Sequence, residues 1–323
     1  MSASPHLHVV TWNVRGARRH EADVSSVLQA AGSNAGPLPH LIMCLQEVRT
    51  RMKQVMPQEF MTVPVSKCGK RRRTDTTLLE PGRWAVLDNS AGKGQTATVI
   101  RAGCAPLWVH WQADVVSGHG CGPGRSQLVA VRCSRSGGAW MEVLNTYVPN
   151  SGVGKPALAK LPQRKVWDAA VAKVLHVRRL AGAAVMWVGD LNVISDSKMD
   201  LWHGKSTRYA GNTVEERNGF HVACAMGNLT DLWRAQHPRD RSFTFFTKRR
   251  GQDFHAMLRS KNKGWRLDYI LGNATLQRKW STVSTTIKTP TQWAGLACSD
   301  HDAVQAVLAR THGTGTSLQS FFV

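Results

Sequence analysis

Acidic residues are scarce in this sequence. Its 323 residues include 21 Asp and Glu against 42 Lys and Arg, which gives a formal net charge of +21. Such an excess of one sign repels itself in a compact fold, so a polyanionic partner is the simplest explanation for it. Nucleic acid is the first candidate and an anionic membrane surface the second. A general solubility bias is the alternative, because composition alone does not identify a partner.

Long apolar runs and paired cysteines are also absent. No stretch reaches the roughly 18 apolar residues of a membrane-spanning helix, so no membrane span is expected. The opening MSASPHLHVV lacks the order of charged, apolar and small residues that marks a secretory signal. The seven cysteines form no CxxC pair. Their odd number and spacing argue against a zinc site or a disulfide framework, and they favour a reducing, intracellular compartment.

Strand-like apolar segments alternate with helical ones along the chain. Helical periodicity predicts helices over residues 21–32 and 163–182, and Thr213 with Glu216 predicts a capping box at the start of a third helix. Central strands covered by helices are typical of one layered α/β domain. The strand-like segments are HVVTWNV, HLIMCLQEV, TATVIRA, LWVHWQADVV, QLVAVRC, MEVLNTYV, AVMWVGDLNV, WRLDYILG and AVQAVLA.

Two segments are dense in Lys and Arg. Residues 67–75 (KCGKRRRTD) and 248–266 (KRRGQDFHAMLRSKNKGWR) both read as loops. Either fits a solvated surface, and the KRRR of residues 70–73 also fits a nuclear address. The second segment leads directly into the strand-like run around Asp268, which favours contact with phosphate over a random surface run.

Polar residues recur where the predicted strands meet loops. In layered α/β proteins such positions bring side chains from distant parts of the sequence into one cleft. A single Asn or His at a strand end is usually structural, so the argument rests on the whole ordered set. That set is Asn13, Glu47, Tyr147, Asn150, Asp190, Asn192, Asp268, Asp300 and His301.

The residue types in this set suit hydrolysis of a phosphodiester. No Ser or Cys lies in a nucleophile context, so water is the expected nucleophile. Asp268 interrupts an apolar run, where a carboxylate is costly unless it is paired, and we expect His301 to be its partner. Such a pair would orient a protonated imidazole. A hard oxygen ligand such as Glu47 suits Mg²⁺, which binds proteins through one or two carboxylates.

The segments TWNVRG, CLQEV, TYVPNSG, GDLNV, GWRLDYIL and CSDHDAV occur in a specific order and approximate spacing. In both respects the sequence resembles the exonuclease III class of apurinic/apyrimidinic endonucleases, within the endonuclease/exonuclease/phosphatase superfamily. The resemblance covers residues 7–310, which leaves residues 1–6 as an N-terminal extension and 311–323 as a flexible tail. It implies a four-layer α/β sandwich, in which two packed mixed β-sheets are flanked by helices.

The activity implied by the resemblance is Mg²⁺-dependent hydrolysis of double-stranded DNA 5′ to an abasic site, in base-excision repair. It includes 3′-phosphodiesterase or 3′–5′ exonuclease side activities. Glu47 would be the metal ligand, with Mn²⁺ as a substitute for Mg²⁺, and Asn13 and Asp300 would lie near the metal. Asp190 would orient or deprotonate the attacking water, assisted by Asn192.

The resemblance also implies how the substrate is held. Asn150, Tyr147 and His301 would bind the scissile phosphate, and Asp268 would fix His301. The motifs FTFFTK and GWRLDY match the family's pocket for the base-free sugar, whose members here are Phe245, Trp265 and Leu267. A sugar without its base flips out of the duplex at low cost, and a tight apolar pocket excludes an intact nucleoside. The structural alternative is that Phe245 and Trp265 are ordinary core aromatics.

Two positions depart from the family pattern. Arg15 stands where many members have Asp or Asn, and a guanidinium cannot ligate Mg²⁺, so it would weaken metal binding or contact phosphate instead. Residues 92–99 (GKGQTATV) differ from the family's usual G-Y-S-G-V. Retrotransposon-type nicking endonucleases, which act on intact DNA, can also read WNVRG, so they are a rival interpretation. A catalytically decayed DNA- or clamp-binding protein is another.

The tail SLQSFFV resembles a degraded sliding-clamp-binding box. Leu318 takes the aliphatic position and Phe321 and Phe322 take the aromatic ones, but Gly315 stands where a glutamine is expected. A short hydrophobic and aromatic tail can dock by folding on its partner. A clamp partner and the basic residues 70–73 together favour a nuclear location, with a mitochondrial or viral context as the alternative. A monomer is expected.

Overall fold

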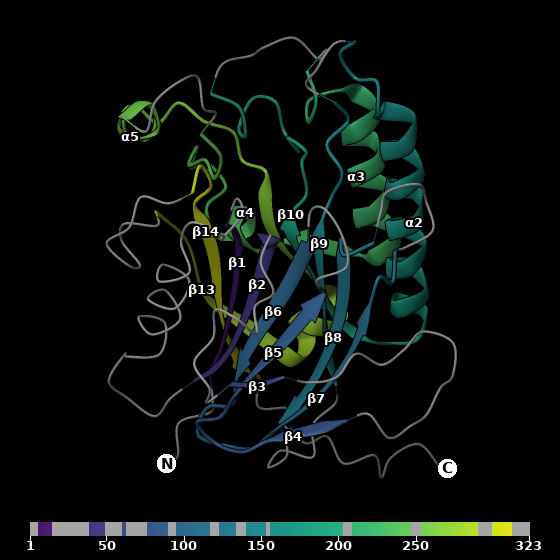
Figure 1. Ribbon diagram of the computed structural model, residues 1–323, viewed down its shortest axis with the longest axis vertical. Helices are drawn as coiled ribbons and strands as arrows, with labels where there is room; N and C mark the ends of the chain where they lie inside the picture. The colour runs from purple at the N-terminus through teal and green to yellow at the C-terminus, as the bar shows by residue number, and fades with distance from the viewer. Residues whose placement is uncertain are drawn as a thin grey trace, which may run out of the picture.

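Two seven-stranded β-sheets form the centre of the protein in a computed structural model (Figure 1). The structure describes residues 6–14, 39–48, 60–62, 76–89, 95–116, 123–133, 140–152, 156–202, 209–246, 253–289 and 299–311. The first sheet has the order β13 (Trp280–Lys288), β14 (Ala303–Arg310), β1 (His6–Asn13), β2 (His40–Val48), β6 (Gln95–Arg101), β5 (Trp84–Asn89), β3 (Phe60–Thr62). The second has the order β11 (Leu229–Asp231), β12 (Asp268–Asn273), β10 (Ala184–Asp190), β9 (Met141–Tyr147), β8 (Ser126–Cys133), β7 (Leu107–Ala113), β4 (Thr77–Leu79).

A parallel strand pair lies near the middle of each sheet. In the first sheet β1 runs parallel to β2, with Asn13 opposite Gln46, and in the second β9 runs parallel to β10, with Tyr147 opposite Asp190. Strand β12 is antiparallel to β10, so its first residue, Asp268, also lies opposite Asp190. Because parallel neighbours end at the same edge, these pairings bring distant polar residues to one side of the molecule.

The two sheets pack face to face through a mainly apolar layer, in which β1 lies against β10 and β2 against β9. Buried amides cross this layer. Gln46 Nε2 donates to Asn145 Oδ1 at 2.9 Å, and Asn145 Nδ2 donates to Ala97 O and Thr98 Oγ1 at 3.1 and 3.2 Å. A buried amide is costly unless it is hydrogen-bonded, so these contacts favour one alignment of the two sheets.

Two long helices cover the outer face of the second sheet: α2 (Leu161–Leu180) and α3 (Val214–Gly227), which lie side by side in Figure 1. Both confirm sequence predictions. The predicted capping box is present, since Thr213 Oγ1 accepts from the Glu216 backbone N–H at 3.1 Å and the Glu216 carboxylate accepts from Thr213 N at 3.0 Å. Three shorter helices complete the described elements: α4 (Leu232–Gln236), α5 (Asp253–Ser260) and α6 (Ala274–Lys279). None of the described helices is long and apolar enough to cross a membrane.

The predicted sandwich of two packed mixed sheets flanked by helices is confirmed. The helix expected over residues 21–32, the basic segment 67–75 and most of the tail lie outside the described residues. Two predictions need correction. Residues 248–266 are not all loop, because they contain α5. Asp268 is the first residue of β12 rather than an interior residue, because the three residues before it bridge to other segments or lie outside the ladder.

Four buried or half-buried charges hold the start of β12 in place. Arg266 donates from Nε and Nη2 to Asp200 at 2.8 and 3.0 Å and from Nη1 to Asp231 at 2.5 Å, and Arg234 Nη2 donates to Asp200 at 2.6 Å. Burial alone would raise the pKa of Asp200, but the two guanidinium groups outweigh it and hold that pKa below its usual value. The network therefore fixes Arg266, which lies between Trp265 and Leu267.

His40 begins β2 as a buried histidine. Its Nδ1 accepts from the Gly103 backbone N–H at 3.0 Å, so the neutral ring carries its proton on Nε2. Burial first, and then the charge of Arg101, lower the pKa of His40 to about 4. The folded protein therefore binds one proton fewer than the unfolded chain between pH 6.5 and 4.

We expect His40 to make the protein less stable as the pH falls. The stability that comes from burying a neutral His40 is fully present above the unfolded pKa near 6.5. It is lost progressively as the pH falls towards 4, because in this range only the unfolded chain binds a proton on His40. From pH 7 to pH 5 this loss is about 2 kcal/mol. Urea unfolding should show His40→Asn losing correspondingly less stability than wild type over this range. The exposed-site control His221→Asn should follow wild type, and identical slopes for wild type and His40→Asn would contradict the assignment.

We expect Arg266→Met to lower the free energy of unfolding by about 3–5 kcal/mol, because it leaves Asp200 and Asp231 with less compensating charge. Chemical denaturation at pH 7 measures this loss. Arg239→Met, at an exposed position, is the matched control and should change stability by less than about 0.5 kcal/mol. Equal losses of stability for the two substitutions would show that the network of Arg266 does not stabilise the fold.

Candidate active site

The polar residues expected from the strand ends meet at one edge of the two sheets. Asn13 Nδ2 donates to Asp190 Oδ2 at 2.9 Å and to Glu47 Oε1 at 3.3 Å, and Tyr147 Oη donates to the same Glu47 oxygen at 2.7 Å. Asn13 and Glu47 come from the first sheet, whereas Tyr147 and Asp190 come from the second. Side chains from four strands are thus joined by three hydrogen bonds.

The backbone at Glu47 is unusual for a strand. Its φ is 55°, in the left-handed region, and the pairing of β2 with β6 shifts register between Gln46 and Val48. A non-glycine residue in this region costs on the order of 1–3 kcal/mol, and such bulges redirect a side chain. The bulge places the Glu47 carboxylate beside Asn13 and Tyr147.

Gly189 allows β10 to approach β9 closely just before Asp190. Its φ is 139°, and a Cβ built there would lie 1.9 Å from the Thr146 carbonyl oxygen. A larger residue would push the strands apart where Asp190 pairs with Tyr147. The glycine of the GDLN motif therefore has a packing reason.

Asp190 is held on its second oxygen by the loop that follows it. The Asn192 backbone N–H donates to Asp190 Oδ1 at 3.0 Å, and Asn192 Nδ2 donates to Val148 O at 2.8 Å. Asn150 Nδ2 donates to Asn192 Oδ1 at 3.4 Å, while Asn150 Oδ1 accepts from Gly152 N at 2.8 Å. Asn192, predicted to assist Asp190, therefore lies in contact with Asp190. Asn150, predicted to bind the phosphate, lies in contact with Asn192.

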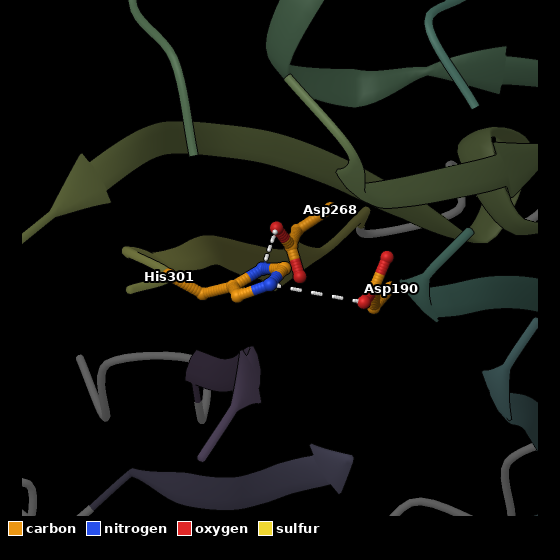
Figure 2. A group of neighbouring side chains, drawn as sticks. All are labelled: Asp190, Asp268 and His301. Carbon is orange, nitrogen blue, oxygen red and sulfur yellow. Dashed lines mark hydrogen bonds and ion pairs between the residues drawn. The ribbon is translucent and has the colours of Figure 1, made fainter. Parts of the chain in front are cut away.

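His301 lies between two carboxylates, which approach its ring from different sides in Figure 2. Its Nδ1 lies 2.8 Å from Asp268 Oδ2, and its Nε2 lies 3.9 Å from Asp190 Oδ2. The expected pairing of Asp268 with His301 is present.

Burial alone would lower the pKa of His301, but Asp268, Asp190 and Asp300 outweigh it, so the pKa is raised and the ring is a cation at neutral pH. Burial and the charge of Asp268 raise the pKa of Asp190. A carboxylate with a raised pKa is a more effective base than an ordinary aspartate.

The backbone around His301 is tied to several elements. Trp12 Nε1 donates to His301 O at 3.2 Å, and Ser299 Oγ accepts from His301 N at 3.0 Å while donating to Asn13 O at 2.6 Å. Asp300, the acid predicted to lie near the metal, is buried next to His301 and contributes to its charge.

An apolar cluster lies beside the imidazole. The ring centroid of Phe245 lies 4.8 Å from that of His301 and 5.9 Å from that of Trp265. The predicted pocket residues Phe245, Trp265 and Leu267 all belong to this cluster, in which the two aromatic rings are only half-buried. The other two members of the cluster, Ile194 and Leu201, were not predicted from the sequence, because two aliphatic residues carry no motif of their own.

Arg125 is a second residue that the sequence reading missed. Its Nη1 donates to Tyr147 O at 3.2 Å, and its guanidinium lies 4.7 Å from the centroid of the Tyr147 ring. An arginine at this distance is attracted to the ring face and adds positive charge beside Glu47 and Tyr147. It lies in GPGRSQ, where no pattern distinguishes it from the many other basic residues.

Among the residues that the structure describes, two sets of side chains are candidates to hold a metal ion. Ligand atoms of Asp190, Asp268 and His301 lie within 4.8 Å of one another. A protonated imidazole bound to Asp268 is a poor metal ligand, however, because ligation requires a neutral ring. Glu47 is the better candidate: its half-buried carboxylate and the neighbouring amide of Asn13 offer hard oxygen atoms, which suit Mg²⁺ or Mn²⁺. Arg15 lies outside the described residues, as do Leu318, Phe321 and Phe322.

Known proteins share this sequence pattern and this fold. The chain is 36% identical over 132 residues to a DNA-(apurinic or apyrimidinic site) endonuclease of Dictyostelium discoideum, and 36% identical over 136 residues to the DNA repair nuclease APEX1 of Danio rerio. These alignments cover 40% and 42% of this chain. The chain spans only 34% and 40% of the length of these two relatives.

Solved structures match over almost the whole chain. The AP endonuclease LMAP of Leishmania major superposes with a TM-score of 0.66 at 20% identity, over 95% of this chain and 89% of that one. An AP endonuclease of Archaeoglobus fulgidus gives 0.63 at 20% identity, over 93% and 98%. At this identity the likeness shows a common fold.

The sequence profile of the Endonuclease/Exonuclease/phosphatase family matches residues 10–301, which include Asn13, Glu47, Asp190, Asp268 and His301. With the relatives above, this match confirms the resemblance to the exonuclease III class. The chain that places these five side chains at one edge of two packed sheets therefore belongs to the endonuclease/exonuclease/phosphatase family.

Proposed function

We propose that this protein is a Mg²⁺-dependent endonuclease that hydrolyses duplex DNA 5′ to an abasic site. One observation carries the proposal: the charged His301 ring is in contact with both a raised-pKa carboxylate, Asp190, and an apolar cluster containing Phe245 and Trp265. The first contact suits attack of water on a phosphate. The second suits a sugar without a base.

The chemistry proposed is hydrolysis of one P–O3′ bond. Asp190 accepts a proton from water, whose oxygen forms the new bond to phosphorus. The imidazolium of His301 donates a hydrogen bond to a phosphoryl oxygen and stabilises its growing negative charge. The departing 3′ oxygen takes up a proton from solvent and becomes a 3′-hydroxyl, Asp190 later returns its proton to solvent, and the other product is a 5′-deoxyribose phosphate. Tyr147 and Asn150 bind the same phosphate in this proposal.

A divalent cation bound by Glu47, near Asn13 and Asp300, would supply positive charge to the phosphate and the leaving oxygen. The protein's own contribution is to fix Glu47, through the hydroxyl of Tyr147 and the amide of Asn13, at a strained backbone position. Such pre-positioning avoids reorganisation during the reaction.

Selectivity for abasic DNA is assigned to Phe245, Trp265 and Leu267. An abasic sugar leaves the helix at low cost and exposes an apolar ring edge, which these side chains can cover, whereas an intact nucleoside is too large. The relative named DNA-(apurinic or apyrimidinic site) endonuclease supports this substrate class. We extend the proposal to 3′-phosphodiesterase or 3′–5′ exonuclease side activities, to a nuclear role in base-excision repair and to clamp binding through the tail.

Asp190→Asn and His301→Gln should each lower the incision rate on a tetrahydrofuran-containing duplex by about 100-fold or more, since each removes a group that acts on the reacting atoms. Duplex binding, measured by fluorescence anisotropy, should persist. Chelation with EDTA should stop wild-type incision, and added Mg²⁺ should restore it.

Asp196→Asn and His221→Gln, which change the same residue types outside the site, serve as controls and should cut like wild type. Normal cutting by the Asp190 or His301 variant would remove the proposed roles. A wild-type protein that binds DNA but turns over none with Mg²⁺ would favour a decayed DNA-binding protein.

Trp265→Ala should reduce incision at an abasic site by about tenfold or more, because truncating a half-buried ring removes much of the contact area that holds the flipped sugar. Any nicking of undamaged plasmid should change far less. Parallel gels with abasic, uracil-containing and undamaged duplexes measure the ratio. Equal losses on damaged and undamaged DNA would favour the rival, a nicking endonuclease that acts on intact duplex.

A further inference from the structure

Arg259, on α5, lies outside every motif that the proposed mechanism uses. In Figure 1, α5 is far from the helical pair α2 and α3, on the other side of the molecule. The last turn of α5 nevertheless contacts the segment that carries His301 and leads into β14. Arg259 Nε donates to Asp302 Oδ1 at 2.8 Å, and its Nη2 donates to Ser299 O at 2.7 Å.

These two hydrogen bonds hold both ends of a four-residue segment, 299–302, which includes Asp300 and His301. The Asp302 side chain is 5% exposed and that of Arg259 is 15% exposed, so water screens the pair poorly. The guanidinium also lies 5.0 Å from the centroid of the Phe246 ring, which limits its freedom. A planar fork that binds two acceptors fixes geometry better than a single contact.

Further hydrogen bonds join this segment to Asn13 and to residues that lie next to the site. Phe246 N donates to Asp300 O at 2.9 Å, Asp302 N donates to Thr244 O at 2.7 Å, and Ser299 Oγ donates to Asn13 O. Thr244 Oγ1 in turn accepts from the backbone N–H groups of Leu267 and Asp268 at 3.0 and 3.1 Å. Residues 299–302 therefore contact three parts of the structure: the segment of Thr244 and Phe246 next to the pocket, the start of β12 through Thr244, and the end of β1 at Asn13.

We propose that Arg259 is a positioning residue for His301: by holding Ser299 and Asp302 it fixes the imidazole between Asp190 and Asp268. The inference rests on the proposed function for its kinetic consequence, whereas its structural consequence is independent of any activity. Displacement of a reacting group by about 1 Å can cost on the order of 100-fold in rate. Loss of Arg259 should therefore act on the chemical step more than on substrate affinity.

The experiment must separate positioning from stability, because Arg259→Ala also leaves the Asp302 carboxylate buried without its cation. The double variant Arg259→Ala/Asp302→Asn removes that unpaired charge while leaving Ser299 O without its donor. Arg278→Ala, on the exposed surface of α6, is the control for loss of one arginine. Three properties are measured for each variant: the thermal unfolding temperature, kcat and KM on a tetrahydrofuran duplex, and the NMR signal of the His301 Nδ1 proton.

We expect Arg259→Ala to lower kcat by about 10–100-fold with KM within about threefold of wild type. The double variant should regain much of the thermal stability but not kcat. In both variants the Nδ1 proton signal, assigned by its loss in His301→Gln, should shift or broaden because the ring is less well held. Arg278→Ala should match wild type in every measurement.

Recovery of kcat together with stability in the double variant, or an unchanged kcat in both Arg259 variants, would overturn the proposal. An unchanged His301 signal in both variants would also overturn it. If the wild-type protein fails to cut abasic DNA, the proposed function is wrong. The NMR comparison then decides alone whether Arg259 positions His301, since it needs no substrate.

Discussion

The hydrogen bond from Asn13 to Asp190 joins the two sheets at the edge where the candidate site lies, and the rest of the site depends on that alignment. Asn13 ends β1 of one sheet, and Asp190 ends β10 of the other. A slip of one residue in either sheet would reverse the faces of its side chains. Beneath the site, the buried contact between Gln46 and Asn145 favours the same alignment. Interior amides thus help to determine which polar groups meet at this edge of the two sheets.

Charge is arranged differently at two scales. The chain as a whole carries a net charge of +21, which favours approach of a polyanion. Inside the site, however, Asp190 and Asp268 flank His301 as the single imidazolium. Acids concentrated within a basic protein can hold a cationic imidazole without repelling the nucleic acid at long range. The overall excess of Lys and Arg and the buried acids are therefore complementary features.

Sequence patterns predicted the elements that depend only on neighbouring residues, such as apolar strands and helix caps. Strand β2 matches HLIMCLQEV residue for residue, and the capping box at Thr213 is present, because apolar runs and local capping depend on neighbouring residues. The contact between Asp268 and His301 was also predictable, since a carboxylate among apolar residues needs a partner. The pairs Arg259–Asp302 and Arg266–Asp200 were not, because 43 and 66 residues separate the partners and a basic chain offers many arginines. Helix α5 was hidden by the same basic composition.

The left-handed backbone at Glu47 has a consequence for how this protein tolerates change. Asparagine and glycine enter that conformation more easily than glutamate, so replacing Glu47 with either would relax the chain. The same replacement would discard the carboxylate that gathers Asn13 and Tyr147. A substitution that stabilises the fold at this position would therefore dismantle the cluster of Glu47, Asn13 and Tyr147, so stability and the proposed function make opposite demands on residue 47.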